Sequence, residues 1–179
     1  MIPSELRAQL GPALGGVFYL HGADEHGKES AARLLVTAHL DPATADFNHD
    51  LIHGSEVGIE ALSSALGTPP LMADWRVIVL RETQGLAASA KARAMLVETA
   101  ASPPPGLALI LLCTVPDQSA ARFYKDLERS ARTIEFVAPS MNDLPEWLME
   151  RVETTLGRRM GETAARALAQ AVGNDLSIL

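Results

Sequence analysis

Five short apolar segments recur along this chain of 179 residues, and they restrict its possible folds more than any other feature. The most apolar of them, LALILLC, has no polar side chain, which is typical of a strand buried on both faces of a sheet. Another, FNHDLIHG, alternates between apolar and polar positions and is predicted to be a half-buried strand. The five predicted strands are Gly16 to Gly22, Phe47 to Gly54, Arg76 to Glu82, Leu107 to Cys113 and Arg132 to Ala138.

Helical sequence separates these strands. Apolar residues recur at helical spacing from Ala31 to Ala38, directly after the first strand. Further helices are predicted over Ile59 to Leu66, Gly85 to Ala101 and Ser119 to Arg129. Strands joined by helical crossovers pair in parallel, so the order βαβαβαβαβ predicts an α/β fold with a parallel five-stranded sheet flanked by helices. Ligands of such sheets bind at the carboxyl ends of the strands.

The pattern changes after Ala138, where two helices follow with no strand between them. They are predicted over Asp143 to Leu156, with Asn142 as the N-cap, and over Glu162 to Val172. We therefore predict an α/β domain over residues 1–138 and the start of a small all-helical domain over 139–179. Two helices leave an apolar stripe uncovered, so we expect the native protein to continue beyond Leu179.

The segment FYLHGADEHGKES joins the first strand to the first helix and nearly matches the phosphate-binding pattern G-x-x-x-x-G-K-[ST]. Gly22, Gly27 and Lys28 occupy the fixed positions of this pattern. Glu29 stands where the pattern requires a hydroxyl group that holds Mg²⁺, and its carboxylate repels phosphate groups. The sequence thus keeps the frame of a nucleotide loop and loses one magnesium ligand.

A second magnesium ligand is replaced as well. In working loops an aspartate at the end of a neighbouring strand binds the same ion. The strand VIVLRE places Arg81 at that position, with Glu82 next to it. Two independent losses predict that the loop from Gly22 to Lys28 is degenerate. We therefore expect no turnover of a magnesium nucleotide, no catalytic residues and no cofactor.

Other patterns give no further site. His49 and His53 have a metal-binding spacing for a helix, but in the predicted strand they stand roughly 13 Å apart, so no metal site is predicted. The single cysteine, Cys113, forms no internal disulfide. The sequence shows no secretory signal and no apolar run long enough for a membrane span, which favours the cytoplasm. The net charge of −7 argues against nucleic-acid binding by the whole surface.

Several segments match one known family in the same order along the chain. They are FYLHGADEHGKES, PLMADWRVIVLRE, SPPPGLALILL, ARFYKDLERS, LPEWLMERV and AVGNDLSIL. The most specific pair is LPxW followed by GNDL. By these segments, which span essentially all 179 residues, the sequence resembles the delta subunits of the bacterial DNA polymerase III clamp loader.

The resemblance implies a fold of three parts. They are an ATPase-like domain of the AAA+ type over residues 1–138, a helical lid domain that begins within 139–179, and a C-terminal collar domain that this sequence does not include. The two-domain prediction made above agrees with the first two parts.

The resemblance also implies a function. Delta subunits bind the ring-shaped sliding clamp (beta subunit) and help to open it for loading on DNA during replication, while sibling subunits hydrolyse ATP. The expected partners are the clamp and the gamma/tau and delta prime subunits, with DNA contacted weakly or through the complex, and no membrane. The chain would then be no enzyme itself but a non-catalytic subunit of a DNA-directed DNA polymerase holoenzyme, a nucleotidyltransferase, in the bacterial cytoplasm.

The family contacts the clamp through two exposed apolar residues just before the third strand, which correspond to Leu71 and Met72. Pro69 and Pro70 stiffen the approach to this pair, and a rigid apolar plug in a pocket makes a binding hot spot. The family favours an aromatic residue at the second place, so Met72 is a departure. The alternative is that the two side chains only cover the edge of the sheet.

Two other functions remain open from the sequence. One is a divergent P-loop kinase or NTPase that uses the loop from Gly22 to Lys28. The other is a DNA-binding module that acts through Arg122, Lys125 and Arg129.

Overall fold

The computed structural model of the chain describes residues 4–116 and 121–172. The chain divides into two compact units, Met1–Phe136 and Val137–Leu179. None of the helices within the described ranges is both long and apolar enough to cross a membrane.

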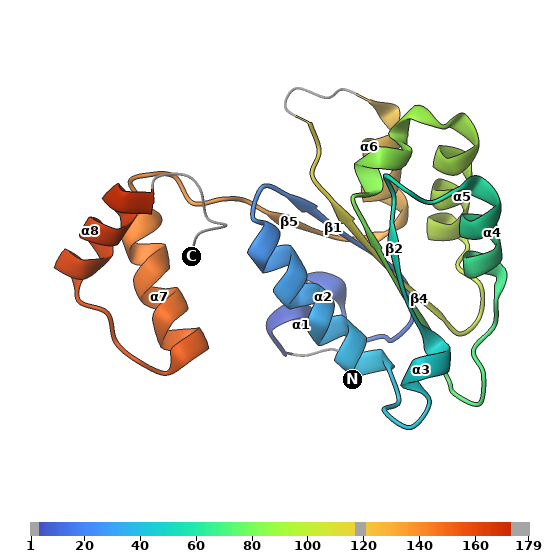
Figure 1. Cartoon of the computed structure of the whole chain (residues 1–179), viewed down its shortest axis with the longest axis horizontal. Helices are drawn as coiled ribbons and strands as arrows, with labels where there is room; N and C mark the ends of the chain where they lie inside the picture. The colour runs from blue at the N-terminus through green and yellow to red at the C-terminus, as the bar shows by residue number, and fades with distance from the viewer. Residues whose placement is uncertain (1–3, 117–120, 173–179) are drawn as a thin grey trace. The chain divides into compact units, whose positions relative to one another are not determined.

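The first unit is built on a parallel sheet of five strands, as the sequence predicts (Figure 1). The strands lie in the order β2-β3-β4-β1-β5, which the sequence does not give. The strands are β1 (Gly16–Gly22), β2 (His49–His53), β3 (Arg76–Arg81), β4 (Leu107–Cys113) and β5 (Arg132–Phe136). The central strand β4 is buried at every position. This burial explains its continuous apolar sequence, because both faces of the sheet are covered.

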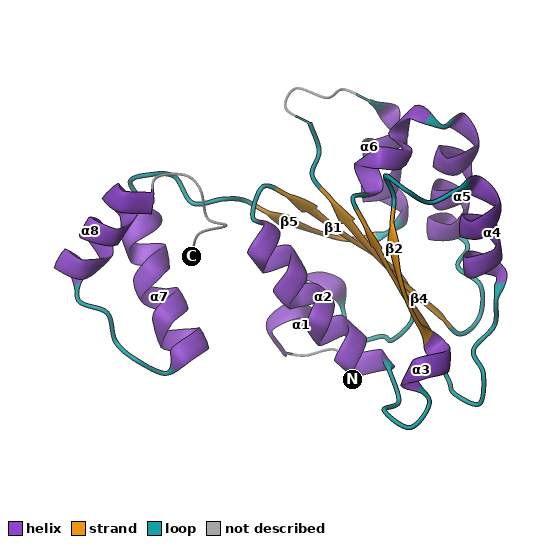
Figure 2. Cartoon of the chain, viewed as in Figure 1, coloured by secondary structure: helices purple, strands orange, loops and turns teal. Residues whose placement is uncertain are grey.

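Helices cover both faces of this sheet (Figure 2). They are α1 (Ser4–Leu10), α2 (Glu25–His39), α3 (Ala45–Asn48), α4 (Ile59–Gly67), the 3₁₀ helix η1 (Thr83–Ala88), α5 (Ala90–Ala101) and α6 (Arg122–Ser130). The sheet has an apolar core on each face, and alternate residues of β1 pack into one core or the other. Val17 and Tyr19 pack with α4, α5 and α6, whereas Phe18 and Leu20 pack with α1 and α2.

The largest differences from the sequence prediction in this unit concern three places, while other elements differ only in where they begin or end. The predicted strand from Phe47 to Gly54 begins later, because residues up to Asn48 form the short helix α3. The predicted helix from Gly85 to Ala101 is split into η1 and α5, because the Ser89 side chain accepts a hydrogen bond from the Ala92 N–H and so caps α5. Helix α1 was not predicted from the sequence.

The second unit contains two helices, α7 (Leu144–Leu156) and α8 (Glu162–Val172). Leu144 and Leu148 of α7 pack against Ala165 and Ala169 of α8. The N-cap of α7 is Asp143, one residue later than the predicted Asn142. The GNDL motif lies outside the described residues.

Two histidines of the first unit, His21 and His39, are buried. The Nε2 atom of His39 accepts a hydrogen bond of 2.9 Å from the Gly15 N–H, and its Nδ1 atom lies 2.7 Å from the Leu35 carbonyl oxygen. The ring is therefore neutral, with its proton on Nδ1. Burial is the main cause that lowers the pKa of His39 below 6.5, against an opposing effect of the Leu35 carbonyl. Burial also lowers the pKa of His21, against an opposing effect of Glu128.

We expect the free energy of unfolding to fall as the pH is lowered from 7 to 5.5. The unfolded chain binds protons at these histidines more readily than the folded chain does, so acid favours unfolding. The loss is at most about 1.4 kcal/mol per pH unit for each histidine. Urea unfolding at several pH values measures it. The variant His39→Gln should give a shallower slope, and Ser63→Ala, which changes an exposed residue without a titratable side chain, should keep the wild-type slope. Equal slopes in all three proteins would contradict the assignment.

Candidate functional site

The degenerate nucleotide loop lies at the carboxyl end of β1, where the sheet is expected to bind ligands. Gly22 ends the strand with a φ of +117°, and a Cβ atom at this position would lie 2.2 Å from the Phe136 carbonyl oxygen of β5. Only glycine fits this close approach. The chain then turns into α2, so the loop occupies the place in the fold that the sequence predicts.

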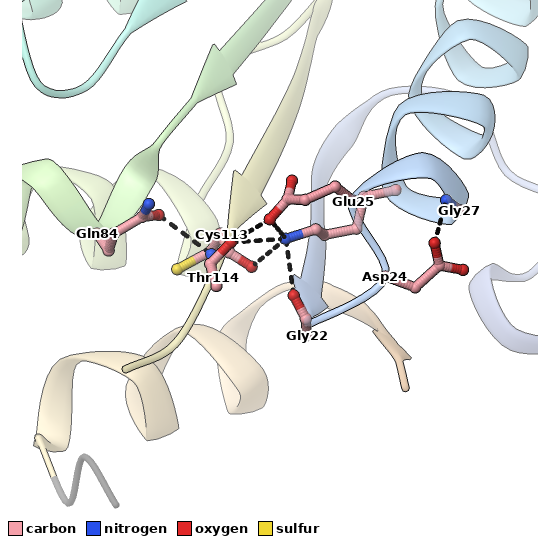
Figure 3. Close-up of polar contacts among 8 residues, drawn as sticks. Gly22, Asp24, Glu25, Gly27, Gln84, Cys113 and Thr114 are labelled. Carbon is pink, nitrogen blue, oxygen red and sulfur yellow. Dashed lines mark hydrogen bonds and ion pairs between the residues drawn. The ribbon is translucent and has the colours of Figure 1, made fainter. Parts of the chain in front are cut away.

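The backbone amides of this loop are bound by the protein itself. The Asp24 carboxylate caps α2 by accepting a hydrogen bond of 2.8 Å from the Gly27 N–H (Figure 3). The Asp24 N–H donates to the Phe136 carbonyl oxygen at 3.0 Å, and the Lys28 N–H donates to the Asp24 carbonyl oxygen at 3.1 Å. In a working loop such amides point at phosphate oxygens. Here a buried carboxylate already holds the anion position at the helix N-terminus.

Lys28 is also fully engaged with the protein. Its side chain is only 1% exposed, and its amine has four acceptors, which come from three elements of the fold. These acceptors are the Gly22 carbonyl oxygen (2.7 Å), Glu25 Oε1 (2.8 Å), the Cys113 carbonyl oxygen (3.0 Å) and Thr114 Oγ1 (2.9 Å), as drawn in Figure 3. The amine therefore links the ends of β1 and β4 to the first turn of α2, instead of reaching toward a phosphate.

The two residues that replace the magnesium ligands bind each other. Arg81 Nη2 lies 2.8 Å from Glu29 Oε2, although the residues are 52 positions apart. In a working site a hydroxyl and an aspartate at these two positions bind one metal ion. Here the guanidinium of Arg81 binds the carboxylate of Glu29 directly. The pair neutralises both charges. Arg81 Nε is buried and has no hydrogen-bond partner among the described residues.

The cavity beside this pair does not fit a magnesium nucleotide. It measures about 420 Å³, and both the lysine and the ion pair lie in its wall. Its charged lining residues are Glu25, Lys28, Glu29, Arg81 and Glu82. Three carboxylates repel a polyphosphate, and both cations are already bound by protein groups. Within residues 4–116 and 121–172, no three His, Cys, Asp or Glu side chains form a group that could hold a metal ion.

The predicted clamp-contacting pair lies at the opposite end of the sheet, in the segment that enters β3. Leu71 is 53% exposed and Met72 is 89% exposed, which makes Met72 the most exposed large apolar residue of the described chain. Met72 also has a φ of +54°, a conformation that side-chain-bearing residues rarely adopt. A side chain held out in solvent in this way does not cover the sheet.

Asn48 holds this segment, and sequence reasoning missed it. Its carboxamide is fully buried and forms hydrogen bonds with both backbone polar groups of Leu71. The sequence offered no signal for this role, because Asn48 stands at a polar position of the predicted strand, where an exposed amide needs no partner in the protein.

The basic residues of α6 are exposed but are not free of acidic neighbours. Arg122, Lys125 and Arg129 are all exposed on this helix. Asp126 lies among them, 3.2 Å from Arg122 and 4.0 Å from Arg129. This arrangement weakens the positive surface that a DNA-binding helix requires.

Comparison with known proteins identifies the family. The family model of the DNA polymerase III delta subunit matches residues 18–137. No curated protein matches the sequence. The fold is similar to that of the Bacillus subtilis DNA clamp loader delta protein (YqeN), with a TM-score of 0.68, 20% identity, and 92% of this chain and 50% of that chain covered.

A second similar structure is a DNA polymerase III gamma subunit-related protein from Thermotoga maritima. Its TM-score is 0.54 at 15% identity, with 96% of this chain and 58% of that chain covered. At these identities the two structures establish the fold, and the chain spans about half of the length of each. Because the family model matches more than half of the residues, the chain belongs to the DNA polymerase III delta subunit family.

Proposed function

We propose that this chain is a clamp-loader subunit that binds the sliding clamp, helps to open it for loading on DNA and does not hydrolyse ATP. Its partners would be the clamp and the gamma/tau and delta prime subunits, with DNA reached through the complex, in the bacterial cytoplasm. Membership of the delta family supports a role in the clamp loader. The exposed Leu71 and Met72 at one end of the sheet support clamp binding, and the degenerate loop at the other end supports the lack of hydrolysis.

The observation that carries the proposal is the exposed turn at Leu71 and Met72. Large apolar side chains on a soluble surface mark binding sites when they are held rigidly and stay open to solvent. Met72 fits a pocket on a partner well because its flexible thioether adapts to an irregular apolar surface. No apolar neighbour within the described residues buries it, which leaves 89% of it available for a partner.

The nucleotide loop supports the second half of the proposal. Turnover needs free backbone amides, a lysine that reaches the phosphates and two magnesium ligands. In this chain the Gly27 N–H donates to the Asp24 carboxylate, and Glu29 is paired with Arg81. Lys28 is buried, and its amine is hydrogen-bonded to protein groups. The loop thus stabilises the fold and leaves hydrolysis to other subunits.

Mixing the purified chain with the sliding clamp of the same organism tests the proposal. We expect a complex that elutes earlier from gel filtration than either protein alone. Two separate peaks at micromolar concentrations of both proteins would contradict clamp binding by this chain.

A further inference from the structure

The Leu71–Met72 turn is bound by one side chain from another part of the fold. Asn48 ends α3, and its fully buried carboxamide contacts Leu71 across 23 residues of sequence. Its Oδ1 atom accepts a hydrogen bond of 2.7 Å from the Leu71 N–H, and its Nδ2 atom donates to the Leu71 carbonyl oxygen at 2.9 Å. The second Nδ2 hydrogen goes to the Thr44 carbonyl oxygen at 3.1 Å. One residue thus binds both backbone polar groups of Leu71, as a neighbouring strand would.

Asn48 is itself held in place by the start of β3. Arg76 Nη1 donates to the carbonyl oxygen of Phe47 at 2.9 Å, and Arg76 Nη2 forms an ion pair with Asp50. The first contact holds the backbone just before Asn48, and the second holds the side chain of Asp50, two residues after it. The carboxamide therefore acts from a rigid support.

The residues around the turn are also packed tightly. Gly106 has a φ of +76°, and a Cβ atom there would lie 2.9 Å from the Pro70 ring. The Arg76 N–H donates to the Gly106 carbonyl oxygen at 2.8 Å. Between these fixed points Met72 adopts its positive φ while its side chain remains in solvent. A disfavoured backbone persists only where its surroundings determine it, and such residues cluster at binding sites.

We propose that Asn48 is a positioning residue that holds the Leu71–Met72 turn in its clamp-binding shape before the clamp arrives. This inference rests on the proposed function, because it concerns the same contact site. A turn ordered in advance loses less conformational entropy on binding, so the hydrogen bonds of Asn48 to Leu71 raise affinity although Asn48 itself is buried.

A double-mutant cycle tests this role with the full chain and the sliding clamp. Asn48→Ala should weaken clamp binding roughly tenfold when Leu71 and Met72 are present, because the turn must then be ordered during binding. When the same change is made in the variant Leu71→Ala/Met72→Ala, it should alter clamp affinity less than twofold, because the two apolar side chains that the turn positions are then absent. Equal losses in both backgrounds would overturn the inference and leave the proposed function intact. A Leu71→Ala/Met72→Ala variant that binds as tightly as the wild type would overturn the inference and remove the contact site from Leu71 and Met72, while clamp binding by the chain would stand.

Amide hydrogen exchange gives a readout that does not depend on the clamp. The Leu71 N–H belongs to an exposed residue, so its protection in the wild-type chain should come from Asn48. We expect exchange at least tenfold faster in Asn48→Ala. An unprotected Leu71 N–H in the wild-type chain would overturn the inference even if the variant failed to fold. Asn48→Asp keeps the acceptor for this N–H and loses the donor to the Leu71 carbonyl, so it should weaken clamp binding while retaining part of the protection.

Thr83→Ala is the matched control. Thr83 is fully buried, its hydroxyl donates to the Leu80 carbonyl oxygen at 3.2 Å, and it lies at the other end of β3. The substitution removes this buried hydrogen bond and leaves the Leu71–Met72 turn unchanged. Clamp affinity and Leu71 exchange should stay at wild-type values. A loss of affinity equal to that of Asn48→Ala would show general destabilisation and overturn the positioning role.

Discussion

Replacing Lys28 with alanine is expected to lower the free energy of unfolding by about 3 kcal/mol. The substitution leaves the carbonyl oxygens of Gly22 and Cys113 without their charged donor at the ends of β1 and β4. A buried acceptor left unpaired costs about 1–3 kcal/mol. Glu25 loses the same partner but is well exposed and remains hydrated. The lysine is therefore part of the structure of this chain, whereas the lysine of a working loop serves the nucleotide.

Urea unfolding of Lys28→Ala and Lys91→Ala measures this effect. Lys91 is an exposed lysine at the start of α5, and its loss should change the free energy of unfolding by less than about 0.5 kcal/mol. A Lys28 variant as stable as the Lys91 variant would show that the four hydrogen bonds contribute nothing. Such a result would reopen the possibility that Lys28 is available for a ligand.

The double substitution Leu71→Ala/Met72→Ala is expected to have the opposite profile, a large effect on binding and a small one on stability. Removal of an apolar plug from a clamp pocket should weaken the complex at least tenfold, about 1.4 kcal/mol. Both side chains are more than half exposed, so the free energy of unfolding should change by about 0.5 kcal/mol or less. Surface plasmon resonance with immobilised clamp measures the first quantity, and urea unfolding measures the second.

The chain offers a matched control for this variant. Leu51→Ala/Met141→Ala removes the same two residue types from other surfaces, where they are 50% and 46% exposed. We expect clamp affinity within twofold of the wild type for this control. Equal affinity of the plug variant and the wild type would remove the contact site from Leu71 and Met72. Equal losses in both double variants would show that the effect comes from general surface apolarity.

The parallel sheet was predictable because its strands are buried on both faces. Strand β4 begins and ends at the predicted residues, since a run of seven apolar side chains has no other favourable place in a chain of this length. The error at β2 has a physical cause. An alternating pattern in FNHDLIHG indicated a strand, but Asn48 satisfies its buried amide by hydrogen bonds to Thr44 and Leu71, which favour a helical turn before the strand.

The sequence shows which ligands the site has lost, but only some of the contacts that replace them. The sequence showed that Glu29 and Arg81 replace two magnesium ligands. Two positions that share one ion in a working site must lie close together, so their opposite charges already pointed to the ion pair that the structure contains. Asp24 could also have been recognised as the N-cap of α2, because aspartate before a helix is a common start signal. The hydrogen bonds of Asn48 to Leu71 depend on tertiary packing, which local sequence does not encode.

Calorimetric titration of the chain with ATP and Mg²⁺ tests the central claim most directly, namely that its own charges fill the nucleotide site. With the Asp24 carboxylate bound to the Gly27 N–H and Glu29 paired with Arg81, we expect no saturable heat up to about 1 mM nucleotide. Magnesium-dependent binding with a Kd in the micromolar range would contradict this account.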